Sequence, residues 1–386
     1  MDQTIKAVHI FTDSKFILWV KSSFALHGWE STFIVLQPAS SNAAHAGSDV
    51  IVTTMDHDWK RKVLNIIDTS HIVFHYFLDN HKASLILNSS GRAIHCWCFY
   101  GAEVYQQTPL FRDMLYGPVT RLYLRLLPEI KYRVMLRSWY YRILRREKPP
   151  VELLQLAIKK ISGILWYVPE EIAFINTRIK LPPWYNFQFF SFSDIIPDPE
   201  ARCQPINKKI LIGNSATIEN NHLDVLDALQ KAQNQAYSVS LPMTYGLFPR
   251  YKSLVKRKYS KVLKERVFFL ENHLPLEKYY SFLAEHPTAV FLHHRQQALG
   301  NVLYMLYIGA KVYLSRENII NQWFRNNQVK VFIFEDDFVD DLNAGSMILE
   351  ASVAENNGKQ IRILLEHQHN LETIQQLEQL IQSKQY

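Results

Sequence analysis

The sequence predicts an α/β protein with two doubly wound parallel sheets, and three observations lead to this fold class. Short, continuous apolar strands alternate with segments of helical periodicity, which is typical of parallel sheets covered by helices on both faces. The alternation occurs twice, once on each side of a proline-rich stretch. The length of 386 residues also favours two domains, because a domain averages roughly 150 residues.

The expected strands are apolar, β-branched or aromatic runs. Those of the first half are KAVHIFT (6–12), TFIVLQ (32–37), DVIVTT (49–54), HIVFHYF (71–77) and AIHCWCFY (93–100). Those of the second half are KKILIG (208–213), YSVSLPM (237–243), RVFFL (266–270), TAVFLHH (288–294), AKVYLS (310–315) and VKVFIF (329–334). Apolar residues three and four positions apart predict helices between them, and the Gln-rich end (374–385) has the same spacing.

The stretch LPPWYNFQFFSFSDIIPDPEARCQP (181–205) separates the two sets of strands. It contains five prolines and no clear period, which is typical of an interdomain boundary. We therefore expect an N-terminal domain over 1–185, a linker over 186–207 and a C-terminal domain over 208–386.

Composition excludes several classes of protein. Apolar residues make up 48% and charged residues 20%, so the chain can bury a core and is not disordered as a whole. The net charge of +7 favours anionic partners. Three cysteines (Cys96, Cys98, Cys203) are too few for a disulfide framework, and we expect buried thiols. The alternative, a metal site at the Cys-x-Cys beside His95, lacks a second ligand pair.

No targeting or membrane-spanning segment is expected. The first residues, MDQTIKAVHIFTD, lack the basic region and apolar stretch of a secretory signal. No apolar run approaches the ~18 residues that are needed to span a bilayer. We therefore expect an intracellular protein that does not cross a membrane.

Residues 112–148 combine basic and aromatic side chains. Ten lysines and arginines stand against three acids, an excess of +7 in 37 residues. This composition suits a helix that lies on an anionic membrane. The alternatives are a solvated basic helix whose aromatic residues belong to the core, and a nucleic-acid surface; no recognised nucleic-acid module accompanies the segment, so we expect no such partner. The residues expected to face the membrane are Arg121, Arg125, Arg137, Trp139, Arg142, Arg145 and Arg146.

Two strand–turn–helix segments of the second half suit anions. In the first, KKILIGNSATIENNHLDVLDAL (208–229), Gly213, Asn214 and Ser215 lie where a strand ends and a helix begins. Such a turn caps the helix and also points free amides, at the positive end of the helix dipole, toward a ligand. A capped helix without a ligand is the alternative.

The second such segment is TAVFLHHRQQALGNVLYMLYIGAKVYLSREN (288–318). Five long polar side chains crowd its turn: His293, His294, Arg295, Gln296 and Gln297. They follow a buried strand at its carboxyl end, where open α/β sheets bind ligands. Arg295 is suited to a bidentate contact with phosphate, and Gly300 leaves room for a ligand near the backbone. An ordinary polar loop is the alternative, although two anion-binding helix starts in one domain fit a diphosphate.

Three further stretches end strands with polar residues. LPMTYGLFPRY (241–251) places Thr244 and Tyr245 after a strand. CWCFYGAEVYQQ (96–107) places Glu103 there, either as a general base or as a surface or ion-paired carboxylate. EDDFVDD (335–341) is expected to be a solvated turn and not a metal site, and we expect no metal site elsewhere.

At these residues the chain resembles the 4-acetamido-4,6-dideoxygalactose (Fuc4NAc) transferases, glycosyltransferase family 56. The resemblance is carried by ILIGNSATIENNHL (210–223), LPMTYGLFPRYKSLV (241–255), HHRQQALGNVLYMLYIGAKVYLSREN (293–318) and HCWCFYGAEVY (95–105). It implies a GT-B fold, in which two Rossmann-like domains face each other across a cleft. It also implies a nucleotide-sugar donor held by the C-terminal domain and a lipid-linked acceptor reached at the membrane.

The resemblance implies roles for individual residues. Its donor-binding positions fall on Gly213, Asn214, Ser215, Thr244, Tyr245, Gln296, Gln297, Gly300, Asn301, Glu317 and Asn318. Arg295 matches a phosphate-side position and is expected to be catalytic. Two departures are visible: the family's GNSGD is GNSAT here, and Glu103 stands where the family more often has Asp.

The expected activity is transfer of a Fuc4NAc-like sugar from a dTDP-linked donor to a polyprenyl-diphosphate saccharide. The enzyme would be peripheral to the cytoplasmic face of the bacterial inner membrane and need no cofactor. If it inverts, Glu103 is the expected base, ahead of Asp13 and His75; the stereochemistry stays open. The alternatives are a GT-B-like nucleotide-sugar epimerase and a non-enzymatic protein that binds anionic membranes.

Overall fold

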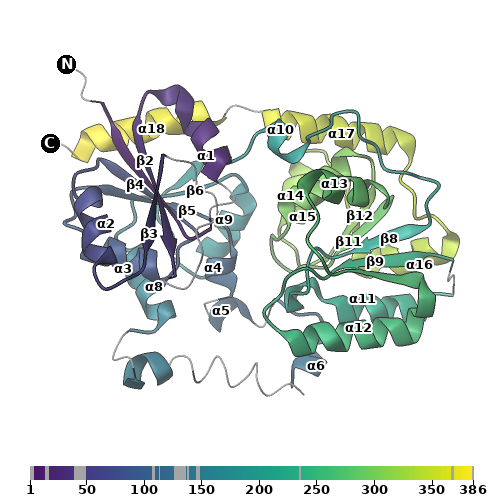
Figure 1. The fold of residues 1–386 in the computed structure, drawn as a ribbon. Coiled ribbons are helices and arrows are strands. Elements are labelled where there is room, and N and C mark those ends of the chain that lie inside the picture. Colours follow the sequence, from purple (N-terminus) through teal and green to yellow (C-terminus); the bar gives the residue numbers. More distant parts are fainter. Residues whose placement is uncertain are drawn as a thin grey trace. The chain divides into compact units, whose positions relative to one another are not determined.

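The structure, a computed structural model, describes residues 4–13, 17–38, 49–106, 109–112, 114–125, 136, 139–144, 148–233, 236–366 and 369–384. The chain forms two compact units (Figure 1). Unit 1 comprises Met1–Leu110, Arg133–Ser191 and Gln368–Tyr386, and unit 2 comprises Phe111–Tyr132 and Phe192–His367. The chain passes from unit 1 to unit 2 between Ser191 and Phe192, within the expected linker.

Unit 1 contains a parallel sheet of seven strands in the order β3-β2-β1-β4-β5-β6-β7. The strands are β1 (Lys6–Phe11), β2 (Glu30–Gln37), β3 (Val50–Thr54), β4 (Ile72–Tyr76), β5 (Ile94–Cys98), β6 (Gly163–Trp166) and β7 (Trp184–Asn186). The five strands expected in the first half are present. Sequence analysis missed β6, a short apolar run, and β7, an edge strand of three residues that follows two prolines.

Helices cover both faces of this sheet (Figure 1). They are α1 (Ile17–Phe24), α2 (Trp59–Ile67), α3 (Asn80–Asn88), α4 (Ala102–Tyr105), α8 (Pro150–Ile158), α9 (Pro169–Asn176) and α18 (His369–Lys384), with α5 (Pro109–Arg112) at the exit to unit 2. Every residue of β4 and β5 is buried, which explains why these strands are apolar throughout and do not alternate.

Cys96 and Cys98 lie in β5, and burial raises the pKa of Cys96 to about 12, so both are inert core thiols.

Unit 2 contains a parallel sheet of six strands in the order β10-β9-β8-β11-β12-β13. These are β8 (Lys209–Ile212), β9 (Ser238–Pro242), β10 (Val267–Leu270), β11 (Thr288–Phe291), β12 (Lys311–Leu314) and β13 (Phe332–Ile333), all at expected positions. The strand order reverses between β8 and β11, which are paired neighbours. Ligands of open α/β sheets bind beyond the carboxyl ends of the strands at such a reversal.

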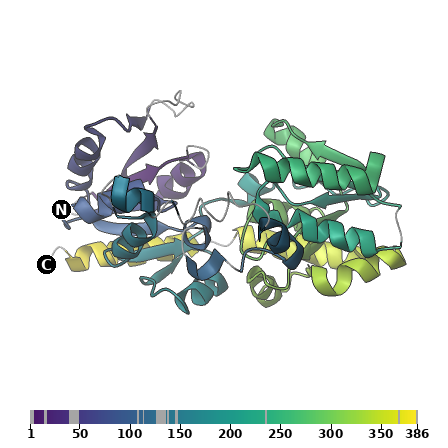
Figure 2. The ribbon, with the colours of Figure 1, turned by 90° about the horizontal axis from the view of Figure 1, so that it is seen from below.

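The helices of unit 2 also lie on both sheet faces (Figure 2). They are α6 (Pro118–Arg125), α10 (Phe192–Ile195), α11 (His222–Lys231), α12 (Pro249–Leu263), α13 (Leu276–Ala284), α14 (Leu299–Tyr307), α15 (Ile320–Asn326), α16 (Phe334–Ala344) and α17 (Ala351–Glu366). The acidic run 335–341 was expected to be a turn, and the structure corrects this. Glu335, Asp336 and Asp337 occupy the first turn of α16, where negative charge complements the helix dipole.

Two segments lie in a different unit from the expected one. The terminal helix α18 packs on unit 1, where Thr373 donates to the carbonyl of Asn186 (2.6 Å) and Trp29 donates to Glu378 (3.0 Å). Helical periodicity identified α18 as a helix but contained no information about its partner. The second segment, Phe111–Tyr132, belongs to unit 2 although Met1–Leu110 and Arg133–Ser191 on either side of it belong to unit 1.

Asp224 of α11 holds this segment by capping α6. Its Oδ1 accepts from the amide of Val119 (2.8 Å) and its Oδ2 from the amide of Thr120 (3.0 Å). These amides lie in the first turn of α6 and lack partners within the helix. Gly117 precedes them, and a Cβ on it would lie 2.4 Å from Asp224 Oδ1, so this approach requires glycine. The cap therefore acts between elements that are about one hundred residues apart in sequence.

Two further side chains of unit 2 hold the same segment. Asn221 Oδ1 accepts from the amide of Gly117 (2.9 Å), and its Nδ2 donates to the carbonyls of Leu115 (3.2 Å) and Leu292 (2.7 Å). His294 Nδ1 donates to the carbonyl of Met114 (2.7 Å). We call Asn221, Asp224 and His294 the clasp. Tyr116, Val119, Tyr123 and Leu124 pack on the core of unit 2 behind it.

Prediction for the clasp: Asp224→Ala should destabilise unit 2 by about 2 kcal/mol or more, because it leaves amide donors without an acceptor. Hydrogen exchange should also speed up in residues 114–125, where the amides lose their partner. Asp227→Ala, one turn later on α11, is the control, because Asp227 forms only an exposed pair with Lys231. Equal exchange rates in the two variants would contradict the role of Asp224.

Burial keeps a set of histidines neutral. They are His9, His75, His95, His222, His286 and His293. Loss of hydration on burial is the main cause that lowers the pKa of each from 6.5. The pKa of His9 falls to about 3 and that of His95 to about 4. Their folded forms therefore do not bind a proton at mildly acidic pH, whereas the unfolded forms do.

Prediction for pH: the free energy of unfolding should fall as the pH drops below about 6.5, since protons then bind preferentially to the unfolded chain. Each of these histidines contributes up to about 1.4 kcal/mol per pH unit, and the contribution is absent above that range. Urea unfolding at about pH 7.5 and about pH 5.5 measures the effect. An unchanged midpoint at the lower pH would contradict it.

Candidate active site

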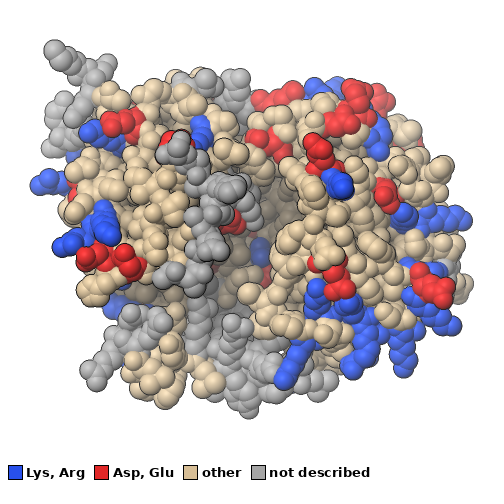
Figure 3. All heavy atoms as spheres, viewed as in Figure 1, with Lys and Arg blue, Asp and Glu red and all other residues tan. Residues whose placement is uncertain are grey.

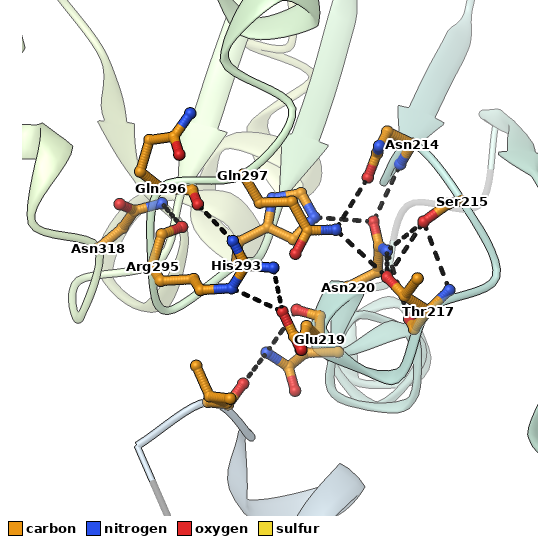
Figure 4. A network of polar contacts seen from close by, with 12 residues as sticks. Asn214, Ser215, Thr217, Glu219, Asn220, His293, Arg295, Gln296, Gln297 and Asn318 are labelled. Carbon is orange, nitrogen blue, oxygen red and sulfur yellow. Dashed lines mark hydrogen bonds and ion pairs between the residues drawn. The ribbon is translucent and has the colours of Figure 1, made fainter. Parts of the chain in front are cut away.

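Two loops of unit 2 meet at the reversal of strand order. The β8 loop (213–217) follows β8, and the β11 loop (292–298) follows β11. Gln297 Nε2 donates to Thr217 Oγ1 (3.2 Å) and to Asn214 Oδ1 (3.4 Å) (Figure 4). The structure therefore brings together the two segments that were predicted to bind a diphosphate.

Asn220 is the centre of the network that joins these loops (Figure 4). Its Oδ1 accepts from the amide of Asn214 (2.9 Å), and the same oxygen lies 2.9 Å from His293 Nε2. Its Nδ2 donates to Thr217 Oγ1 (2.7 Å) and Ser215 Oγ (3.1 Å). Because a backbone amide can only donate, the amide of Asn214 fixes Oδ1 as an acceptor, and His293 Nε2 must carry a hydrogen.

Gly213 is required by this network. It has a φ of +66°, and a Cβ on it would lie 2.3 Å from Asn220 Oδ1. The expected tight turn is therefore present, and its glycine makes room for a protein side chain. Sequence analysis missed Asn220, although it lies within the matched string ILIGNSATIENNHL.

His293 is a neutral part of the network. Burial, and then the positive charge of Arg295, hold its pKa well below 6.5. With the hydrogen on Nε2, its Nδ1 carries a lone pair. Within the described chain, this Nδ1 and the Oε1 of Gln297 are buried acceptors without a hydrogen-bond partner. Such atoms are rare in folded proteins and call for an explanation.

Arg295 forms a buried ion pair with Glu219. Its Nε and a terminal nitrogen lie 2.7 and 2.6 Å from the same Oε2 atom of Glu219. A second terminal nitrogen donates to the carbonyl of Gln296 (2.7 Å), and Asn318 donates to the carbonyl of Arg295 (3.1 Å). The guanidinium is thus held in one orientation beside the network. Glu219 was not expected from the sequence, because nothing near it in the chain marked it as a partner of Arg295.

Helix α14 begins directly after the β11 loop. Its cap, Ala298, has a left-handed φ of +55°, so the loop turns sharply into the helix. The free amides of the first turn and the positive end of the dipole lie beside Gln296 and Gln297. A Cβ on Gly300 would make an ordinary contact with Ile195 (3.4 Å), and Asn301 donates to the hydroxyl of Tyr279 (2.8 Å). Of these two expected donor-binding residues, Asn301 is thus bonded to α13, and Gly300 lies next to α10.

The loop after β9 reaches the β8 loop. Tyr245 accepts from Asn214 Nδ2 through its hydroxyl (2.7 Å), and its carbonyl accepts from the amide of Ala216 (2.8 Å). Tyr245 is half exposed, and Thr244 precedes it. Tyr245 thus joins the network, and its expected role in donor binding stays a prediction. Its hydroxyl is a phenol whose pKa is raised by burial, so it stays protonated.

A cavity of about 820 Å³ opens beside the β11 loop. Segment 114–121, α11 and α16 form its walls, and Leu292, His294 and Glu317 line its end at the sheet. Glu317, an expected donor-binding residue, is exposed, whereas its neighbour Asn318 is buried beneath Arg295. The clasp holds the wall that segment 114–121 contributes.

The expected bases of unit 1 are held differently. Glu103 is fully buried, and its Oε1 accepts from the indole of Trp97 (3.1 Å) and the amide of Tyr100 (2.9 Å). His75 is also fully buried and lies 3.0 Å from His95. Asp13 is exposed. The role of Glu103 as a base stays a prediction, and the two hydrogen bonds to its Oε1 are those of a structural acceptor.

The residues expected to face the membrane are exposed where the structure describes them, whereas Tyr116 and Tyr123 of the same segment are partly buried against the core of unit 2. Arg121 and Arg125 are exposed on α6, and Trp139 (51% exposed) and Arg142 lie at or in a short π-helical turn, Tyr140–Leu144. Arg137, Arg145 and Arg146 lie outside the described residues.

A second basic element adjoins α6 and was missed. Helix α12 carries lysine and arginine but no acid within PRYKSLVKRKYSKVL, and Lys258 lies 5.0 Å from the ring of Tyr123. Figure 3 shows blue side chains gathered over α12. We call the following residues the basic face: Arg121, Arg125, Arg250, Arg257, Lys258 and Lys261.

The described residues contain no group of three or more His, Cys, Asp or Glu side chains placed to hold a metal ion. Among the helices that the structure describes, none is both long and apolar enough to cross a bilayer.

Solved structures share this fold at low identity. The N-terminal domain of Candida albicans trehalose-6-phosphate phosphatase has a TM-score of 0.63 at 9% identity, covering 100% of this chain and 98% of its own. A glycosyltransferase from Rickettsia africae has a TM-score of 0.63 at 11% identity, covering 98% and 99%. Anabaena Alr3699/HepE in complex with UDP and glucose has a TM-score of 0.59 at 12% identity, covering 98% and 100%. The fold is GT-B, which confirms the predicted fold class.

The sequence itself matches a family profile. The family is described as 4-alpha-L-fucosyltransferase glycosyl transferase group 56, and the match spans residues 152–353, slightly more than half of the chain. It includes the β8 loop, the β11 loop and the network of Asn220. The chain belongs to glycosyl transferase group 56 and is a glycosyltransferase.

Proposed function

We propose that the enzyme transfers a 4-acetamido-4,6-dideoxyhexose from a dTDP-linked donor to a polyprenyl-diphosphate-linked saccharide. The observation that carries the proposal is the joining of the β8 and β11 loops at the strand reversal of unit 2, in a chain of group 56. Donor diphosphate binds at this junction. The family argues against the epimerase and the non-enzymatic alternatives.

The junction offers the groups that a leaving diphosphate needs. Arg295 supplies a positive charge, and the first-turn amides of α14 supply donors at the positive end of a helix dipole. Glu219 pre-organises the guanidinium, so little reorganisation is needed as charge develops. Such electrostatic stabilisation is worth on the order of 3 kcal/mol per donor. This chemistry requires no cofactor.

The buried acceptors of the network suit the donor's hydroxyl or N–H groups. Nδ1 of His293 and Oε1 of Gln297 lack partners among the described residues, and a bound donor would supply them. Structures of Anabaena Alr3699/HepE hold UDP and UDP-glucose, which supports a nucleotide-sugar donor for a protein of the same fold. The choice of dTDP and of the sugar follows from the resemblance to Fuc4NAc transferases.

The basic face supports action at an anionic membrane, where a polyprenyl-linked acceptor resides. Lysine and arginine near an anionic surface contribute about 1 kcal/mol each. Leu122 (57% exposed) lies between Arg121 and Arg125 on α6, and Trp139 is the kind of aromatic residue that is enriched at membrane interfaces. We place the enzyme at the cytoplasmic face of the bacterial inner membrane as a peripheral protein.

Prediction for the donor site: dTDP at 100 times its dissociation constant should stabilise the protein by about 2.7 kcal/mol, seen as a rise in Tm. UDP, GDP and CMP, tested alongside, identify the preferred base. Gln297→Glu should weaken dTDP binding at least about tenfold, because it places a negative charge beside the diphosphate. Arg295→Ala should remove the shift.

The control for this prediction is Gln322→Glu, the same change at an exposed position of α15. It should leave the dTDP shift intact. A dTDP shift that survives both Gln297→Glu and Arg295→Ala in folded protein would contradict the assignment of the diphosphate site.

Prediction for the membrane: wild-type protein should sediment with vesicles that contain phosphatidylglycerol and not with phosphatidylcholine vesicles. Arg125→Glu combined with Arg257→Glu should weaken this binding by about tenfold or more, since each lost cation contributes about 1 kcal/mol. Lys60→Glu combined with Lys62→Glu makes the same charge change on α2. If both double variants bind equally, the basic face is not the membrane surface.

A further inference from the structure

His294 has a fixed tautomer. Its Nδ1 lies 2.7 Å from the carbonyl oxygen of Met114, and a carbonyl can only accept. Nδ1 must therefore carry the hydrogen, and in the neutral ring Nε2 carries the lone pair. Among the described residues Nε2 has no hydrogen-bond partner, and the half-buried ring lines the 820 Å³ cavity.

This arrangement is the one that a general base needs. A base requires a lone pair that faces substrate and a second contact that holds the ring in place. The carbonyl of Met114 supplies that second contact, and the clasp in turn holds Met114's segment through Asn221 and Asp224. Glu103, the base expected from the sequence, lies buried in unit 1 with its Oε1 already accepting two hydrogen bonds.

The cavity lies next to the proposed leaving group. His294 precedes Arg295 in the chain, so their Cα atoms are about 3.8 Å apart. In a nucleoside diphosphate sugar the anomeric carbon is one oxygen atom away from the β-phosphorus. A diphosphate held beside Arg295 and α14 therefore places its anomeric carbon near the β11 loop. Glu317 lines the same cavity and is a matched donor-binding position of the family.

We propose, resting on the proposed function, that His294 is the catalytic base of sugar transfer. Nε2 takes the proton of the acceptor hydroxyl while that oxygen forms the new bond to the anomeric carbon. The bond between the anomeric carbon and the diphosphate breaks, and its electron pair leaves with the nucleoside diphosphate. The imidazolium then releases its proton to solvent. A single displacement of this kind inverts the anomeric configuration.

Charged side chains from several elements line the cavity together with His294. They come from α6, α11, the loop after β12 and α16: Arg121, Asp224, Asp227, Lys231, Glu317 and Glu335. Arg295, the next residue after His294, instead forms an ion pair with Glu219. Asp224 is engaged with the amides of α6 and Asp227 with Lys231. The carboxylate of Glu317 lies at the same end of the cavity as His294. It is the rival candidate for the base, so an experiment must distinguish the two residues.

The test uses His294→Asn in the full chain. The amide nitrogen of asparagine takes the position of Nδ1 and still donates to Met114, whereas the nitrogen at the ε position is lost. Transfer is assayed with dTDP-linked Fuc4NAc and a short polyprenyl-diphosphate disaccharide. We expect kcat to fall by about 10²- to 10⁴-fold, and the loss of activity at low pH to vanish. The dTDP thermal shift should stay as in wild type.

Further variants test whether His294 acts as a base or only stabilises the structure. Glu317→Gln changes a residue matched to donor binding, so its kcat is free to fall, but the loss of activity at low pH should persist because His294 is still present. His57→Asn, at an exposed site in unit 1, should leave kcat unchanged. His294→Ala, which also loses the contact to Met114, should lower both kcat and Tm.

Any of the following results would overturn the proposal. The first is a near wild-type kcat in folded His294→Asn. The second is loss of the dTDP shift in that variant, which would place the nucleotide in the cavity. The third is a product that retains the anomeric configuration, or a kcat whose acid limb disappears in Glu317→Gln. The fourth is no transfer by wild type from any nucleotide sugar, which would contradict the proposed function as well.

Discussion

The Oδ1 atom of Asn220 accepts hydrogen bonds from both loops at the strand reversal, and the geometry of the site depends on it. One bond comes from the backbone of the β8 loop and the other from His293 of the β11 loop. The oxygen approaches so closely that residue 213 must be glycine. Because the backbone amide of Asn214 requires Oδ1 to be an acceptor, the hydrogen of His293 must be on Nε2. Burial keeps that ring neutral. One side-chain oxygen thus determines the separation of two loops and a protonation state.

The same few residues connect this network to the clasp. Asn221 follows Asn220, and His294 follows His293, so residues adjacent in sequence make contacts with different parts of the structure. Asn220 and His293 join the loops, whereas Asn221 and His294 hold segment 114–125. A shift of either loop would move a cavity wall and the junction of the two loops together. The chain therefore couples the placement of α6, part of the basic face, to the geometry of the proposed donor site.

The sequence predicted what depends on local pattern. All eleven expected strands are present, because buried parallel strands are continuous apolar runs that differ visibly from amphipathic helices. The turns at Gly213 and Arg295 were found because a glycine in one case and a cluster of long polar side chains in the other directly follows a buried strand. Strand β7 was missed because three residues beside prolines form no pattern.

What the sequence did not reveal depends on contacts between distant residues. Nothing near Glu219 in the sequence marks it as the partner of Arg295. In the sequence Asp224 is an ordinary acid in the first turn of a helix, and only the structure shows that it accepts hydrogen bonds from Val119 and Thr120. The same is true of α18, whose period fits either unit. Helix α12 is a different case, because its basic composition was visible; only its contact with Tyr123 joins it to α6 as one face.

In the β11 loop, three successive side chains make contacts in three different directions. His293 faces the network, His294 the cavity, and Arg295 the carboxylate of Glu219. Each of these side chains is fixed by a contact with a different element, so the loop has little freedom to relax. Such rigidity costs conformational entropy at folding, but it removes reorganisation when charge develops on a leaving group. The ring of His293 stays neutral, so it adds no second positive charge to the network beside the guanidinium of Arg295.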